Sequence, residues 1–315
     1  MSRLLIRQAR VVDPSQRIDA GLDILLVDGK VARLAERIED RKAEMLDEAG
    51  LVAAPGFIDL HVHLREPGYE YKETVASGSA AAVAGGFAAV CCMANTQPVN
   101  DSAAVTEFIR ARAREVDLCR VYPVGAVSKG LAGEELAELG EMVRAGAVAF
   151  SDDGRPVASA YLMRRALEYA QLFGTAIVDH CEDPTLVAKG VMHEGEAATR
   201  LGLRGIPAAA EEVMVARDVI LSELTGGKVH IAHLSTRGAL ERVREAKGRG
   251  LPVTCEVTPH HLALTDARVA ATDYDTNTKM NPPLRSADHV EALLAGVGDG
   301  TIDCLATDHA PHHAD

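Results

Sequence analysis

The sequence lacks an apolar run that approaches the roughly 20 residues a helix needs to cross a bilayer. Its opening segment, "MSRLLIRQARVVDPSQ", is too broken by charge for a secretory signal peptide. These two absences favour a cytoplasmic protein with no membrane partner.

Cysteine pairs with the spacing of a metal or redox motif are also missing. The six cysteines are scattered along the chain, and none forms a CxxC motif. Several lie in apolar stretches such as "AAVCCMA" and "IDCLATD", which is typical of buried thiols.

Positive charge is scarce as well. The chain has 33 Lys and Arg against 46 Asp and Glu, a net charge of −13 with His neutral. This balance argues against a surface that neutralises nucleic-acid phosphates or anionic lipid. Small molecules or other proteins are the expected partners.

The composition is that of a globular protein with either one large domain or a barrel and an appendage. The chain has 315 residues, 47% of them hydrophobic. Residues 1–54 alternate apolar and polar in short bursts with Asp-Gly and Pro-Ser between them, which predicts a small antiparallel β unit.

From residue 55 to 315 the pattern changes to short apolar runs that alternate with helical stretches. This pattern is typical of parallel strands with crossover helices. Segments such as Ala208 to Leu224 place apolar residues at helical spacing, as the outer helices of a barrel should. Eight runs are found, which predicts a (β/α)8 barrel: "FIDLHVH", "FAAVCCM", "LCRVYPV", "AVAFS", "TAIVDH", "KVHIAH", "LPVTCEV" and "DCLATD".

Potential metal ligands stand where these runs end. In a barrel the carboxyl ends of the strands form the active-site rim, so such residues are expected to converge. An HxH pair or a single strand-end histidine is by itself weak evidence, but buried imidazoles and carboxylates on five strands are costly unless they are paired or metal-bound. Zinc or a similar cation suits this set: His61, His63, Asp152, Asp153, His180, His233 and Asp308.

The stretch "FIDLHVHLRE" shows how the first strand would contribute. Side chains alternate across a strand, so Asp59, His61, His63 and Arg65 share one face. The two imidazoles can bind one ion. Asp59 is a candidate to accept a hydrogen bond from the second nitrogen of a ligating histidine, and Arg65 is suited to a substrate carboxylate.

Motifs spread over residues 56 to 312 resemble those of the dihydroorotases of the amidohydrolase superfamily, specifically the longer bacterial type. They are "GFIDLHVHLREPG", "MANTQPV", "FSDDG", "VDHCED", "IAHLST", "EVTPHHL", "KMNPPLR" and "ATDHAPH". The resemblance implies a metal-dependent hydrolase barrel over residues 55–315, with residues 1–54 as part of a small β-sandwich domain. It also implies a cytosolic enzyme that closes N-carbamoyl-L-aspartate into L-dihydroorotate, with loss of water, in pyrimidine biosynthesis.

The resemblance further implies two zinc ions bridged by Asp153, with Asp152 as the competing candidate for the bridge. His61, His63 and Asp308 would bind the first ion, and His180 and His233 the second. Related enzymes use a carboxylated lysine as the bridge, which "AVAFSDDG" does not offer. Asp308 is the expected general base and acid beside a zinc-bound hydroxide. The expected substrate contacts are His63, Leu64, Arg65, Asn95, Asn281 and His312.

Two alternatives remain open. One is a different cyclic amidohydrolase of the hydantoinase or allantoinase type, which the absent lysine disfavours. The other is a non-catalytic scaffold for aspartate transcarbamoylase, which the full set of expected ligands disfavours. Family members continue well beyond strand eight, so the C-terminal part of the family pattern is expected to be missing here. The resulting open strand edges of the β unit favour association, for example a homo-oligomer.

Overall fold

The computed structural model describes residues 2–47 and 50–314, which fall into two compact units, Met1–Phe57 and Ile58–Asp315. Each unit is a separate body with its own core. Among the described residues, no helix has both the length and the apolar character that a bilayer crossing requires.

The first unit is a five-stranded sheet. Strand β1 (Arg3–Asp13) pairs antiparallel with β2 (Ile18–Val27), and β2 pairs antiparallel with β3 (Lys30–Ala35). The short strands β4 (Glu44–Leu46) and β5 (Val52–Ala53) both run parallel to β1. The sheet is therefore antiparallel at one side and parallel at the other. Its assignment to a β-sandwich domain stays a prediction.

The turn between β2 and β3 follows from its two residues. Asp28 and Gly29 both have positive φ, at 50° and 75°. A tight hairpin of this hand requires left-handed backbone at both central positions, which Asp and Gly tolerate better than other residues. The Asp-Gly pair therefore sets the hairpin that brings β3 beside β2.

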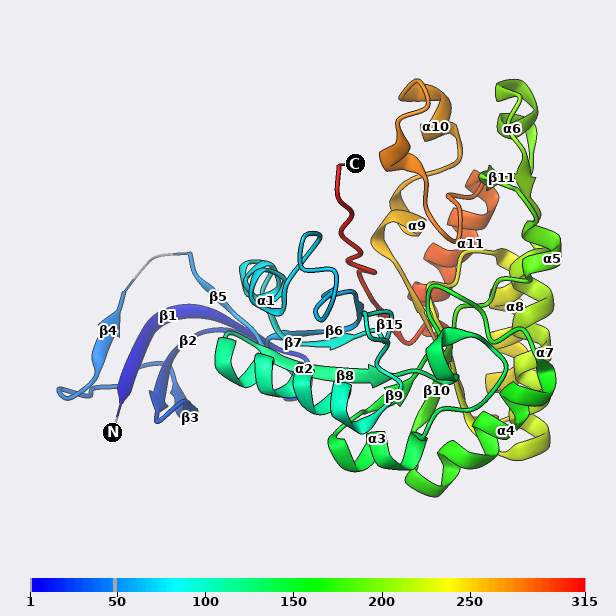
Figure 1. Ribbon diagram of the computed structural model, residues 1–315. Helices are drawn as coiled ribbons and strands as arrows, with labels where there is room; N and C mark the ends of the chain where they lie inside the picture. The colour runs from blue at the N-terminus through cyan, green and yellow to red at the C-terminus, as the bar shows by residue number, and fades with distance from the viewer. Residues whose placement is uncertain (1, 48–49, 315) are drawn as a thin grey trace. The chain divides into compact units, whose positions relative to one another are not determined.

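The second unit is a parallel β barrel wrapped by helices (Figure 1). The strand order is β15-β14-β13-β10-β9-β8-β7-β6. The first strand also meets the segment that follows the last strand, because Val62 forms a parallel bridge with His309 and the His63 amide donates to the His309 carbonyl at 2.8 Å. The strands are β6 (Phe57–Val62), β7 (Phe87–Cys92), β8 (Arg120–Gly125), β9 (Ala149–Phe150), β10 (Ala176–Asp179), β13 (Lys228–Ile231), β14 (Val253–Val257) and β15 (Cys304–Leu305).

Each strand corresponds to one of the eight apolar runs, so the predicted barrel is confirmed. Helices follow the strands and lie outside them (Figure 1). The predicted helix from Ala208 to Leu224 is α7 (Ala209–Thr225). The other main helices are α1 (Val75–Ala84), α2 (Ala103–Val116), α3 (Leu139–Ala145), α4 (Ala160–Ala170), α8 (Arg237–Gly248) and α11 (Ala287–Gly298).

The main core lies between the barrel and these helices. Phe150, Ile177 and Ile231 from the strands pack with Leu167 of α4 and Leu240 of α8, all at most 1% exposed. Burying side chains of this size supplies about 1.5–3 kcal/mol each. This core fixes the strands in register, and the register sets where their carboxyl ends meet.

Short elements occupy the connections between the barrel strands and the main helices. Two of them, α6 and α10, project from one end of the barrel (Figure 1). The short helices are α5 (Pro184–Val187), α6 (Glu196–Leu201), α9 (Pro259–Ala263), α10 (Ala267–Ala271), η1 (Lys129–Leu131), η2 (Gln171–Phe173) and η3 (Thr276–Thr278). Strands β11 (Met192–His193) and β12 (Gly205–Ile206) pair with each other in parallel.

Candidate metal centre

Six potential ligands converge at the carboxyl end of the barrel, although they come from five different strands. His61 lies on β6 and His63 just after it, and the others follow β9, β10, β13 and β15. We call this group the Asp153 cluster: His61, His63, Asp153, His180, His233 and Asp308. Its histidines and Asp153 are at most 3% exposed.

Asp153 lies at the centre of the cluster. Its Oδ2 atom is 3.5 Å from His61 Nε2 and 3.4 Å from His63 Nε2. Its Oδ1 atom is 3.3 Å from His180 Nδ1 and 3.2 Å from His233 Nε2. The two oxygens of one carboxylate therefore face two separate pairs of imidazoles, as a bridge between two cations would.

Asp308 lies on the side of the cluster formed by strand β6. Its Oδ1 atom is 3.1 Å from His63 Nε2 and 3.5 Å from His61 Nε2. The Asp308 side chain remains 17% exposed, so it is the member of the cluster that a bound molecule can most readily reach. It holds a left-handed backbone with φ of 50°, and His233 has φ of 30°, conformations that concentrate at functional sites.

The donor set fits a divalent metal ion. His61 Nε2 is buried and has no hydrogen-bond partner among the described residues, which is unusual for a buried polar atom. His61, His63 and Asp308 form one group whose ligand atoms lie within 4.8 Å of one another, and His61, Asp153 and His233 form a second. Imidazoles and carboxylates in this proportion are typical ligands of zinc and similar cations.

The charges of the cluster compensate one another. Burial opposes ionisation of Asp153, but the charge of His61 and hydrogen bonds from His180 and His233 outweigh it and hold the pKa of Asp153 well below its usual range. Burial likewise opposes ionisation of Asp308, yet its contact with His63 and the nearby imidazoles lower its pKa to about 2. Both acids are therefore carboxylates at neutral pH and can bind a cation.

The second nitrogen of each strand β6 histidine has a partner from another strand. His61 Nδ1 is 2.6 Å from Glu256 Oε1 on β14. His63 Nδ1 is 2.8 Å from the Asn95 side-chain oxygen, in the loop after β7. Both contacts leave the Nε2 atoms directed into the Asp153 cluster, which is the orientation that ligation requires.

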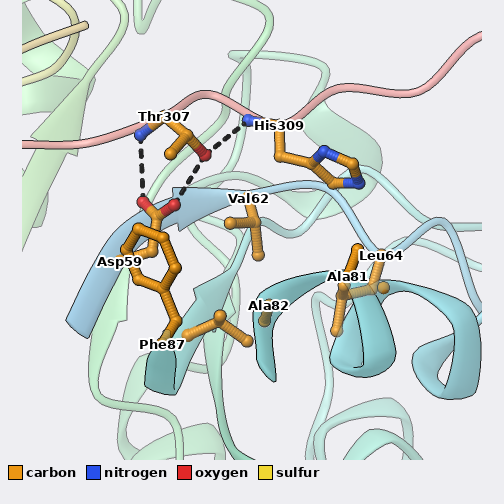
Figure 2. Close-up of a pocket in the computed structure, with 10 residues that line it drawn as sticks. Asp59, Val62, Leu64, Ala81, Ala82, Phe87, Thr307 and His309 are labelled. Atoms are coloured by element: carbon orange, nitrogen blue, oxygen red, sulfur yellow. Dashed lines mark hydrogen bonds between the residues drawn. The ribbon is translucent and has the colours of Figure 1, made fainter. Parts of the chain in front are cut away.

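The hypothesis that Asp59 orients a ligating histidine is wrong. Asp59 accepts hydrogen bonds from the Thr307 amide at 3.1 Å and the Thr307 hydroxyl at 2.6 Å (Figure 2). It also accepts a hydrogen bond from the His61 backbone amide, and not from the His61 ring. It therefore ties the first strand of the barrel to the segment after the last. Sharing a face with His61 did not place Asp59 within reach of the His61 ring.

Asp152 and Asp153 point in different directions although they are adjacent. Asp152 accepts hydrogen bonds from the amides of Val127 at 2.8 Å and Ser128 at 2.9 Å, and from the Ser128 hydroxyl. It anchors the loop after β8 and makes none of the contacts to the imidazoles. Of the two candidates for the bridge, the geometry favours Asp153.

The expected substrate-binding residues differ in their burial and in their hydrogen-bond partners. Arg65 is 8% exposed and its Nε donates to the Pro311 carbonyl at 3.2 Å. Asn281 Nδ2 donates to Glu182 Oε2 at 3.0 Å, beside His180. His312 is exposed.

Leu64 does not join the Asp153 cluster. It is 3% exposed and packs with Val62, with Val75 of α1 and with Val90 of β7. Its side chain supports the strand from the outer face, so only its backbone remains available for a substrate contact.

Sequence reasoning missed two carboxylates that contact the cluster. Glu256 touches His61, and Glu182 lies with Oε2 3.2 Å from His180 Nε2. Glu182 stands two residues after His180, a spacing that could have suggested a neighbour on the same loop. Glu256 lies on β14 inside the apolar run "LPVTCEV", which ends in valine, so no polar residue at the end of that run pointed to it.

Comparison with known proteins gives consistent family and fold matches. A family model described as "Dihydro-orotase-like" matches residues 50–239. A protein of Anaeromyxobacter dehalogenans (strain 2CP-C) named "Dihydroorotase" is 64% identical over 312 residues, which cover 99% of this chain and 72% of the relative. One from Solibacter usitatus (strain Ellin6076) with the same name is 55% identical, covering 98% of this chain and 71% of the relative.

Solved structures of related barrels are similar in fold. L-Hydantoinase (Dihydropyrimidinase) from Arthrobacter aurescens has a TM-score of 0.84 at 24% identity, covering 99% of this chain and 70% of that chain. D-Hydantoinase (Dihydropyrimidinase) from Thermus sp. has a TM-score of 0.78 at 26% identity, covering 98% of this chain and 69% of that chain. At 24% identity, the likeness to the Arthrobacter enzyme shows the fold alone.

Proposed function

Since this chain belongs to the dihydroorotase family of cyclic amidohydrolases, and carries the dihydroorotase function of pyrimidine biosynthesis, we propose that the Asp153 cluster is its active site. The reaction is the reversible closure of N-carbamoyl-L-aspartate into L-dihydroorotate with loss of water. The observation that carries the proposal is the central position of Asp153, with each carboxylate oxygen facing a different pair of imidazoles.

We infer that the cluster holds two zinc ions. His61, His63 and Asp308 would bind the first, His180 and His233 the second, and Asp153 would bridge them. When bound, such a cation polarises the carbonyl of the reacting amide and makes water acidic enough to lose its proton near pH ~7. Two observations support zinc as the cation: His61 Nε2 has no hydrogen-bond partner within residues 2–47 and 50–314, and imidazoles and carboxylates are balanced in the cluster.

Asp308 is the proposed general base and general acid. In the hydrolytic direction its carboxylate accepts the proton of the attacking water, whose oxygen forms a bond to the ring amide carbon. The same group then delivers that proton to the ring nitrogen as the carbon–nitrogen bond breaks. In the biosynthetic direction the proton moves the opposite way. With a pKa of about 2, Asp308 is ionised at neutral pH and so begins the hydrolytic reaction without a proton.

The substrate carries two carboxylates and a ureido group, so it needs cationic and amide donors. Arg65 is the proposed partner of one carboxylate, because a guanidinium matches a carboxylate with two parallel hydrogen bonds. Asn95, Asn281 and His312 would supply further contacts. Asn95 and Asn281 already contact His63 and Glu182, so each would hold substrate with its remaining hydrogen-bonding capacity.

Asp308→Asn tests the assignment of the proton carrier. The amide keeps the size of the side chain and one oxygen but cannot take up the proton, so turnover should fall by about 10²–10⁴-fold while much of the metal is retained. Steady-state rates in both directions, with metal content measured on the same samples, provide the readout. Near-normal turnover in this variant would refute the role of Asp308.

A second candidate is the hydrolysis of other cyclic amides, because the matched solved structures include hydantoinases. Rates with dihydroorotate, dihydrouracil and allantoin separate the two. A preference for dihydroorotate is expected, since Arg65 would have no carboxylate to bind in dihydrouracil. The same assay with and without aspartate transcarbamoylase, together with the mass of the particle in solution, tests for that partner and for a homo-oligomer.

A further inference from the structure

Glu256 is a carboxylate inside the barrel for which the reaction above has no use. It is 1% exposed, and it lies on β14 behind the Asp153 cluster. Its Oε1 atom is 2.6 Å from His61 Nδ1 and also accepts the His233 backbone amide at 3.3 Å. A charged group in such a place is costly unless it is fully hydrogen-bonded.

The other oxygen of Glu256 is also engaged. Oε2 lies 3.2 Å from His230 Nε2 on the neighbouring strand β13. His230 is held in turn, because its Nδ1 atom is 2.8 Å from the Thr254 hydroxyl. His230 and Thr254 are paired residues of β13 and β14, so the register of the sheet fixes this chain of contacts.

The contact with His61 determines which nitrogen of that ring is free. An ionised carboxylate can only accept hydrogen bonds, so His61 must donate through Nδ1. When the ring is neutral, as a histidine that binds a metal must be, its lone pair then lies on Nε2, a buried atom without a hydrogen-bond partner among the described residues. That atom lies 3.5 Å from oxygens of both Asp153 and Asp308.

We propose that Glu256 is a positioning residue of the dihydroorotase reaction, which holds His61 with Nε2 directed at the metal and strengthens it as a ligand. The inference rests on the metal-dependent function proposed above. A carboxylate behind a histidine fixes its tautomer, fixes the ring orientation and raises the basicity of the opposite nitrogen. Glu256 acts through His61 and does not itself touch substrate.

His63, just after strand β6, can be compared with His61, because its Nδ1 atom also has a hydrogen-bond partner. His63 is oriented by the neutral amide oxygen of Asn95 at 2.8 Å, whereas His61 is oriented by a carboxylate at 2.6 Å. A charge-assisted hydrogen bond is roughly twice as strong as a neutral one. The two histidines therefore differ in how strongly their partners polarise them, and His61 is the stronger ligand of the pair.

The test compares metal binding by Glu256→Gln and Glu256→Leu with binding by the wild-type protein. The glutamine removes the charge and the leucine also removes the acceptor. Each protein is stripped of metal and titrated with Co²⁺, followed by its visible absorption, and with Zn²⁺ in competition with a chromophoric chelator. We expect about 10–100-fold weaker binding in Glu256→Gln and a larger loss in Glu256→Leu.

Asp23→Asn is the matched control for the loss of a buried carboxylate. Asp23 is 2% exposed and accepts the backbone amides of Gln8 and Ile38 within the first unit. This variant should lose stability and keep the metal affinity of the wild type. Circular dichroism verifies folding of all variants, and if Glu256→Leu does not fold, Glu256→Gln decides the question.

A tautomer measurement complements the affinities. In ¹⁵N-histidine spectra of the metal-loaded wild type, with His61 assigned through His61→Asn, the proton should be on Nδ1. Metal affinity of folded Glu256→Gln within threefold of wild type, or a proton on Nε2 of His61 in the wild type, would overturn the proposal. A wild-type protein that binds no metal would instead contradict the proposed function.

Discussion

Acidification should destabilise this protein through a histidine that lies away from the Asp153 cluster. His193 on β11 is 6% exposed, and its Nδ1 atom accepts a hydrogen bond from Arg285 Nη1 at 3.2 Å. Arginine has only donors, so the contact requires an unprotonated Nδ1. Burial, and then the charges of Arg285 and His289, lower the pKa of His193 from 6.5 to about 4.

The direction and size of the effect follow from this shift. The folded-state pKa lies below the unfolded one, so between about pH 4 and 6.5 the unfolded chain binds the extra proton. The contribution of unprotonated His193 to the free energy of unfolding is therefore complete above pH 6.5 and is lost as the pH falls through this window. Within the window, each pH unit lowers the free energy of unfolding by about 1.4 kcal/mol, which gives a decrease of roughly 2–3 kcal/mol between pH 7 and 4.5.

His193→Asn isolates this contribution. The side-chain oxygen of asparagine can replace Nδ1 as the acceptor for Arg285, and asparagine does not titrate. Urea unfolding of both proteins, with metal removed by a chelator, gives the free energy of unfolding at pH 7 and pH 4.5. The advantage of the wild type over the variant should shrink by about 2 kcal/mol on acidification.

Comparing the two proteins at each pH cancels the titration of all other groups that the variant leaves unchanged. If the difference in free energy of unfolding between the wild type and His193→Asn is the same at both pH values, the reasoning is refuted.

Three further outcomes are expected from substitutions in the second unit. Asp153→Asn should lose bound metal, as measured by elemental analysis, whereas Asp152→Asn should keep it. Asp152→Asn should instead lower the free energy of unfolding in urea by about 1–3 kcal/mol, because it weakens a buried acceptor of three hydrogen bonds. Equal metal content in the two variants would contradict the assignment of Asp153, and not Asp152, to the metal site. Gly68→Ala should lower stability by more than about 1 kcal/mol, since φ is +96° and an added Cβ would lie 2.0 Å from the Gln97 carbonyl oxygen; an unchanged melting temperature would count against this. Arg65→Gln should raise KM more than it lowers kcat, because its contact is present in ground and transition states alike; an unchanged KM would rule out this role.

The sequence by itself determined the barrel and most of the residues that gather at its rim. Eight apolar runs separated by helical stretches match β6 to β10 and β13 to β15. Runs of this kind can be read locally, because burial on both faces of a parallel strand demands continuous apolar residues. Ligands at the ends of such runs converge in any barrel with this strand direction, so His61, His180 and His233 could be singled out without coordinates.

Only the tertiary structure decided which side chains support those ligands. Glu256 reaches His61 across 195 residues of sequence, while Asp59, two residues from His61 on the same face, bonds to Thr307 instead. Adjacent Asp152 and Asp153 likewise face different partners. Alternation along a strand tells which face a residue occupies, but the neighbour that it meets depends on the register between strands and on local backbone geometry. Packing of the whole barrel sets both, and no short stretch of sequence encodes them.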